Sequence, residues 1–110
     1  MPENSSSGKN SKWTFLTNHA HVLLCLAKNQ TMRMRDIALE VGITERAVQR
    51  IVSELVEGGF IICKRDGRCN HYSICMDQHL RHPIESHRKI IDLIRLIYEN
   101  DDSVIDKNQS

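Results

Sequence analysis

Hydrophobic residues in the middle of the chain recur with the period of an α-helix. Between residues 44 and 57 they stand at i, i+1, i+4, i+5, i+8 and i+9, which places them along one stripe of a helix. A shorter apolar run over residues 37–41 stops at Gly42, and Thr44 is a favoured N-cap residue. Two helices separated by about three residues, one of them glycine, are typical of a helix-turn-helix. The stripe comprises Ala47, Val48, Ile51, Val52, Leu55 and Val56.

The polar face of the second helix suits contact with DNA. In a DNA-binding helix-turn-helix this helix enters the major groove, and its N-terminal residues meet the base edges. Arg46 and Arg50 can pair with guanine, and Gln49 can pair with adenine. Arg33 and Arg35 come just before the first helix, where backbone N–H groups often meet phosphate. Solvated surface charge is the alternative for all five residues.

A β-hairpin is predicted directly after the second helix. Residues 60–63 and 70–74 are strand-like apolar runs, and Asp66-Gly67 between them favours a hairpin turn because glycine tolerates positive φ. The expected tip of the hairpin is basic and carries Lys64, Arg65 and Arg68. A helix-turn-helix followed by such a hairpin is a winged helix.

Two further helices are expected, over residues 13–28 and 84–100. The first is apolar around so much of its circumference that it has to bury more than one face, and the last is apolar enough to need a surface to bury against. The last one repeats isoleucine at three- and four-residue steps, as in a coiled-coil seam. A two-fold partner is the favoured cover, and packing against the chain's own first helix is the alternative. The expected homodimer interface comprises Leu23, Ile90, Ile94, Ile97 and Tyr98.

Composition indicates one modest globular domain. The chain has 110 residues, 40% of them hydrophobic, and a formal charge of +1, so any DNA affinity would come from a local patch. It has no apolar run long enough for a membrane span and no secretory signal, which favours a cytoplasmic location. The predicted organisation is a disordered lead (1–12), a winged helix-turn-helix (13–76), a dimerisation helix (77–100) and an acidic flexible tail (101–110).

The cysteine spacing argues against a metal site or a disulfide within the hairpin. If Asp66-Gly67 is the two-residue turn, Arg65 pairs with Arg68 and Lys64 with Cys69. Cys63 and Cys69 then point to opposite faces. Cys69 and Cys75 share a face but lie roughly 20 Å apart, too far for either kind of site. An exposed, reactive thiol at Cys69 stays open, because basic neighbours lower a thiol's pKa.

The remaining chemistry of the sequence is sparse. Three histidines, His79, His82 and His87, are expected to be titratable surface residues. A metal site that they would form together across a dimer is an open alternative. The sequence holds no Gly-rich phosphate loop and no nucleophile elbow, so we expect neither an enzyme nor a cofactor. Any small-molecule effector is unknown and would have to bind at the dimer interface.

A family resemblance adds to this interpretation. The stretch DIALEVGITERAVQRIVSELVEGGFI, followed by RDGRCNHYSI, resembles the winged helix-turn-helix transcription regulators of the MarR and ArsR type from bacteria and archaea. It covers about residues 20–76 and implies that Arg68 reaches a minor groove or phosphate, and that residues 30–34 could add a third strand. Many such wings carry a second arginine where this chain has Cys69. The residues that it implies face the major groove are Thr44, Glu45, Arg46, Gln49 and Arg50.

The expected fold is therefore α+β, with a winged helix-turn-helix core of three helices and a β-hairpin wing, plus a C-terminal helix. The expected function is a sequence-specific transcription regulator that binds double-stranded DNA as a homodimer. One alternative is a protein-interaction module without nucleic acid, which the near-neutral charge and Glu45, Glu54 and Glu57 keep open. The other is a thiol- or metal-responsive regulator.

Overall fold

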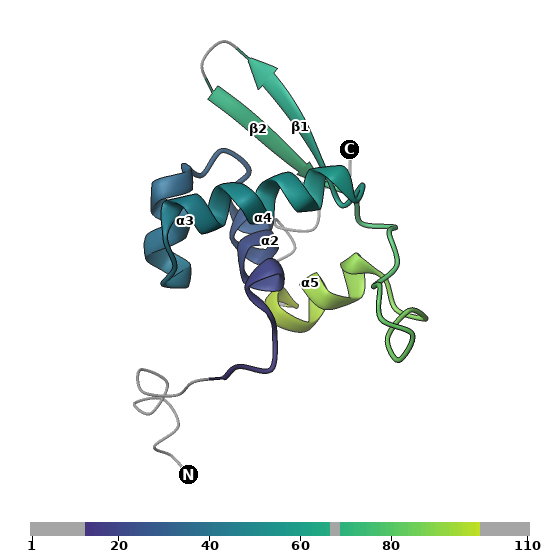
Figure 1. The fold of residues 1–110 in the computed structure, drawn as a ribbon. Coiled ribbons are helices and arrows are strands. Elements are labelled where there is room, and N and C mark those ends of the chain that lie inside the picture. Colours follow the sequence, from purple (N-terminus) through teal and green to yellow (C-terminus); the bar gives the residue numbers. More distant parts are fainter. Residues whose placement is uncertain (1–12, 67–68, 100–110) are drawn as a thin grey trace.

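A computed structural model describes residues 13–66 and 69–99 of the chain, without the side chains of residues 65–70. The described part contains four helices and one hairpin (Figure 1). Within these ranges no helix has the length and apolar character needed to cross a membrane. The α+β prediction is confirmed. The elements are α2 (Asn18–Lys28), α3 (Met34–Val41), α4 (Glu45–Glu57), β1 (Ile61–Asp66), β2 (Cys69–Ile74) and α5 (Ile90–Tyr98).

The helix-turn-helix consists of α3, α4 and the three residues between them. Gly42 ends α3 in the left-handed conformation at φ 86°, and its N–H donates to the Ala38 carbonyl at 2.8 Å. The Thr44 hydroxyl accepts from the Ala47 N–H at 3.1 Å and so caps α4. Both the glycine stop and the threonine cap match the expectation, because each satisfies backbone groups that a helix end leaves unpaired.

The core lies where α2, α3 and α4 meet the base of the hairpin. The apolar stripe of α4 faces it, except for Val56, which is 37% exposed. Burial of this stripe holds α4 in place and leaves its opposite face to solvent. The largest fully buried side chains come from every helix and from β1: Val22, Leu26, Ile37, Val48, Ile51, Ile61 and Ile94.

The hairpin register differs from the prediction. Asp66 pairs with Cys69, and Lys64 pairs with His71 rather than with Cys69. The predicted pairing of Arg65 with Arg68 is therefore wrong. Residues 67–68, between the two strands in the sequence, lie outside the described residues.

Two physical reasons favour the observed register. The predicted one would set two arginines directly opposite each other, and like charges in that position destabilise a sheet. The observed one pairs Ile61 with Ile74, both buried, and lets the Cys75 N–H donate to the Phe60 carbonyl at 2.8 Å. The shift amounts to two residues, so every residue keeps its predicted face.

Residues 30–34 do not form the third strand. Asn29 starts a turn there: its backbone carbonyl accepts from the Met32 N–H at 3.1 Å, and its side chain accepts from the Thr31 N–H at 3.1 Å. One strand-like contact remains, since the Tyr72 N–H donates to the Gln30 carbonyl at 3.0 Å. The sheet in the described residues has two strands.

Both outer helices begin later than expected. Thr17 caps α2 by accepting from the Ala20 N–H at 3.2 Å, so the helix starts at Asn18 and not at residue 13. Helix α5 starts at Ile90 and not at residue 84. There the Lys89 N–H donates to the Asp92 side chain at 2.9 Å. The backbone of Lys89 also forms an isolated antiparallel β-bridge with His79, which closes residues 79–89 into a loop.

The residues expected at a dimer interface lie in two different environments. Leu23, Ile90 and Ile94 are buried in the chain's own core, at 2%, 4% and 0% exposure. The Tyr98 hydroxyl donates to the Leu24 carbonyl on α2 at 3.0 Å. In the structure these four residues therefore pack within their own chain, which was the alternative to a dimer interface. Ile97 alone is exposed, at 46%.

Candidate nucleic-acid interface

Helix α4 presents a polar face to solvent that begins at its first residue. Glu45, Arg46, Gln49 and Arg50 are all exposed, while the opposite stripe is buried. Thr44 is exposed as well, but its hydroxyl is engaged in capping the helix. The five residues expected in the major groove therefore share one accessible end of one rigidly packed helix.

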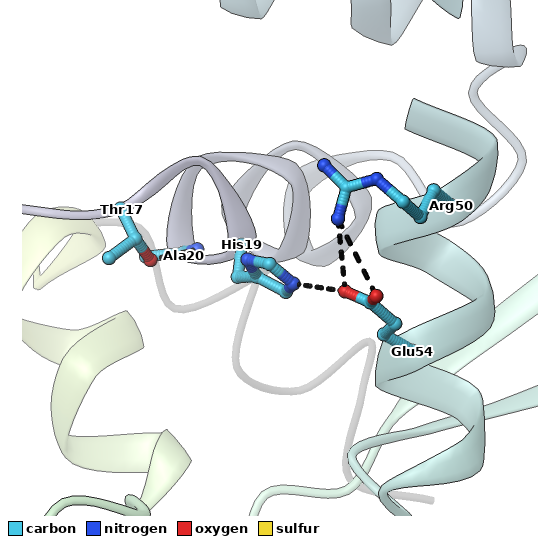
Figure 2. A network of polar contacts seen from close by, with 5 residues as sticks. All are labelled: Thr17, His19, Ala20, Arg50 and Glu54. Carbon is cyan, nitrogen blue, oxygen red and sulfur yellow. Dashed lines mark hydrogen bonds and ion pairs between the residues drawn. The ribbon is translucent and has the colours of Figure 1, made fainter. Parts of the chain in front are cut away.

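One of these residues belongs to a network that the sequence analysis did not anticipate. Arg50 Nη1 lies 3.4 Å from Glu54 Oε1 and 3.5 Å from Oε2, and His19 Nε2 lies 2.7 Å from Glu54 Oε1 (Figure 2). His19 is the donor, because an ionised carboxylate can only accept. The network joins α4 to the second residue of α2.

The Glu54 carboxyl is held in its ionised form. The hydrogen bond from His19 has the largest effect and lowers the pKa of Glu54. Desolvation comes second and raises that pKa, and the charge of Arg50 then lowers it further. The i, i+4 spacing of Arg50 and Glu54 on one helix could have been recognised in the sequence. The contact with His19, 35 residues away, leaves no local signal there.

The arginines before α3 are exposed. Arg33 is the residue directly before the first helical residue, and Arg35 lies in the first turn beside Asp36. Arg33 occupies the N-cap position, but its side chain makes no hydrogen bond to the helix end. Phosphate contact and solvated charge both fit this placement.

The wing contributes one described basic side chain. Lys64 is exposed on β1. Arg65 pairs through its backbone with Asn70, and its side chain lies outside the described part. Arg68 lies outside it altogether, so the expected contact of Arg68 with DNA stays a prediction.

The cysteines and histidines do not assemble into a site within the described residues. No group of three or more potential metal ligands forms among them. Cys63 is exposed, whereas burial raises the pKa of Cys75, and burial together with Glu40 raises that of Cys25. The side chain of Cys69, for which a reactive thiol was left open, falls outside the described side chains.

The three histidines for which a composite metal site was left open occupy the exposed loop before α5. His79 Nδ1 donates to the Ser86 carbonyl at 2.9 Å, and His82 Nδ1 accepts from the Ile84 N–H at 3.1 Å. His87 is exposed. Both recorded contacts are local hydrogen bonds that shape the loop.

An open groove of about 710 Å³ lies between the start of α2, the end of α4 and residues 80–93. Its lining combines apolar and charged side chains. The expectation that a ligand would need a dimer interface did not anticipate this space within one chain. The lining includes Phe15, Leu16, Leu23, Phe60, Leu80, Ile90 and Leu93, with Glu54, Glu57, Arg81 and Glu85.

Comparison with known proteins identifies the helix-turn-helix. Residues 17–62 match the protein family described as winged helix-turn-helix DNA-binding. A search of curated proteins finds no match. The match spans α2, α3, α4 and the start of β1, and it confirms the winged helix-turn-helix prediction.

Two transcription regulators of known structure are similar to this chain. One is MepR, a transcription regulator of the Staphylococcus aureus multidrug efflux pump MepA, with a TM-score of 0.51 and 14% identity over 98% of this chain and 76% of that one. Another is the zinc-dependent MarR family transcriptional regulator AdcR in its Zn(II)-bound state, with a TM-score of 0.47 and 18% identity over 96% and 70%. At 14% identity the likeness to MepR establishes the fold alone.

Proposed function

We propose that this winged helix-turn-helix protein is a sequence-specific transcription regulator that binds double-stranded DNA as a homodimer. The observation that carries the proposal is the exposed face of α4, where Arg46, Gln49 and Arg50 occupy the first half of a helix whose other side is buried. MepR, which shares the fold, is itself described as a transcription regulator. A cytoplasmic location and a non-enzymatic role belong to the same proposal.

The mechanism follows from the geometry of α4. Its N-terminal half enters the major groove, where arginine can bond bidentately to guanine and glutamine to adenine. Lys64, Arg65 and Arg68 of the wing contact the backbone or the neighbouring minor groove. Arg33 and Arg35 add phosphate contacts near the start of α3. Base contacts select the sequence, and phosphate contacts fix the orientation of the protein on the duplex.

A homodimer would bind two half-sites about one helical turn of DNA apart. The support for it is apolar surface that remains uncovered after the chain has folded. On α5 the side chains of Leu96 and Ile97 are 70% and 46% exposed, and before α2 those of Trp13 and Phe15 are 68% and 91% exposed. Exposed apolar surface of this kind marks interaction sites when it is contiguous.

The proposal is tested by fluorescence anisotropy with a pool of random duplex DNA at low and moderate salt, followed by selection of the preferred sequence. Affinity should fall steeply with salt, because phosphate contacts release counterions. Arg50→Ala or Gln49→Ala should cost about 1–3 kcal/mol on the selected sequence and relax its specificity. Arg68→Ala should weaken binding to all sequences and flatten the salt slope by about one unit.

Absence of binding at low salt would refute the proposal. It would instead favour the protein-interaction module, which shares the fold without needing nucleic acid. A control variant, Arg88→Ala in the loop before α5, removes one exposed positive charge that is far along the chain from α4 and precedes the outer face of α5. If that variant loses as much affinity as Arg50→Ala, general charge and not the α4 face governs binding.

A further inference from the structure

The face of α4 that carries the base-reading residues also carries an acid, Glu54. Its side chain is 47% exposed, and its carboxylate lies between two cationic or donor groups, Arg50 on the same helix and His19 on α2 (Figure 2). A negative charge there repels DNA phosphates and so works against affinity. Its presence at the interface therefore calls for a role other than holding the DNA backbone.

The ion pair with Arg50 does not supply that role through stability. The ion pair of Glu54 with Arg50 is solvent-exposed, at 3.4 Å, and pairs of this kind contribute little to folding. What such a pair can do is restrict a long side chain. Arginine has many rotamers, and its planar guanidinium recognises a base only when the plane is correctly oriented.

The contacts of Glu54 leave Arg50 able to recognise a base. Among the described residues Glu54 engages the guanidinium through Nη1, while an arginine carries five N–H donors in total. The donors on Nη2 and Nε can therefore still face the major groove of DNA. A guanidinium restrained on one edge and available on another is preorganised for bidentate contact.

His19 fixes the carboxylate that does the restraining. The contact from its Nε2 to Glu54 Oε1, at 2.7 Å, is the shortest in the network and comes from a different helix. Helix α2 is anchored by buried Val22 and Leu26, three and seven residues further along. The orientation of Glu54 is thus fixed by a helix that is anchored in the core, and not only by its own helix.

We propose that Glu54, anchored by His19, is a positioning residue that orients the Arg50 guanidinium and thereby determines sequence preference more than overall DNA affinity. The inference rests on the proposed function, because it presupposes that Arg50 reads a base. It gives Glu54 a measurable signature: its loss lowers the ratio of specific to non-specific binding.

The test compares Glu54→Gln with Glu57→Gln on the selected duplex and on random duplex. Both variants remove one negative charge from exposed positions of α4, so both should bind random DNA somewhat more tightly. Only Glu54→Gln removes the carboxylate that holds Arg50. We expect the specificity ratio to fall on the order of tenfold in Glu54→Gln, a fraction of what one bidentate contact supplies. Glu57→Gln should keep the wild-type ratio.

A double-mutant cycle separates positioning from a direct effect of Glu54 on DNA. In an Arg50→Ala background, Glu54→Gln should cause no further loss of specificity, because the group that it positions is gone. His19→Leu in the wild-type background should lower the ratio in the same direction. Thermal unfolding of each variant checks that the fold is intact.

The outcomes are distinguishable. A wild-type protein without sequence preference would overturn the proposed function and this inference with it. A wild-type protein that discriminates, together with Glu54→Gln that discriminates equally well, would overturn the inference alone. An equal loss in the Arg50→Ala background would also overturn it, since Glu54 would then act on DNA independently of Arg50.

Discussion

Replacing Ile94 with alanine tests whether α5 belongs to the core of a single chain. Ile94 has no exposed surface, although its helix was expected to form a dimer seam. The substitution removes three carbon atoms, which corresponds to about 2.4 kcal/mol at about 0.8 kcal/mol for each buried methylene. A cavity adds to that figure, so the loss in unfolding free energy should lie within about 2–5 kcal/mol.

Ile97→Ala is the matched control on the same helix. It removes the same atoms from a side chain that is 46% exposed, so the corresponding loss is about 1 kcal/mol. Urea unfolding followed by far-UV circular dichroism measures both, since the single tryptophan, Trp13, is too exposed to report on the core. A domain of this size should lose roughly 4–8 °C in Tm for each kcal/mol.

Protein concentration separates core packing from subunit packing. Destabilisation by Ile94→Ala should be the same in dilute and concentrated samples, because its partners lie in the same chain. A homodimer held by the outer face of α5 would instead make the effect of Ile97→Ala depend on concentration. If Ile94→Ala cost less than about 1 kcal/mol in dilute samples, the packing of α5 against this core would be wrong.

Three further predictions concern the N-cap of α4, the reactivity of the cysteine thiols and the stability of the protein at acidic pH. Thr44→Ala should lower the unfolding free energy by about 1 kcal/mol in urea titrations, because α4 loses its N-cap, while Thr44→Ser should restore most of it. Iodoacetamide followed by peptide mass mapping should label exposed Cys63 before Cys25 and Cys75, whose pKa values burial raises. Folding lowers the pKa of Glu54, so its stabilising effect is present at neutral pH and is lost as the pH falls below its ordinary value near 4.5; Glu54→Gln should therefore show a shallower loss of stability on acidification than the wild type.

Local signals in the sequence predicted the helix-turn-helix well. Gly42 and Thr44 act within one helical turn of their own positions, so residue type alone indicates the stop and the cap. The register of the hairpin needed more than its turn residues. Pairing of Ile61 with Ile74 depends on a core that both strands reach, and a turn dipeptide carries no information about that core.

The last helix shows why apolar periodicity does not name a partner. Its pattern is compatible with burial against any apolar surface, and the sequence does not tell a second copy from α2 of the same chain. In the structure Ile90 and Ile94 face the chain's own core, while Leu96 and Ile97 face outward. If a dimer uses α5, this outward face and not the predicted seam is the surface available to it.

The mixed charge on α4 makes physical sense for a regulator that must discriminate between sequences. Affinity for phosphate rises with every cation and does not depend on sequence, so a uniformly basic helix would bind most of the genome about equally well. The acids Glu45, Glu54 and Glu57 offset Arg46 and Arg50 on one helix, which keeps non-specific attraction low. Specific contacts then account for a larger share of the binding energy. A carboxylate that also orients an arginine would raise specificity in two ways. It weakens the attraction to any phosphate, and it strengthens the one contact that depends on the base.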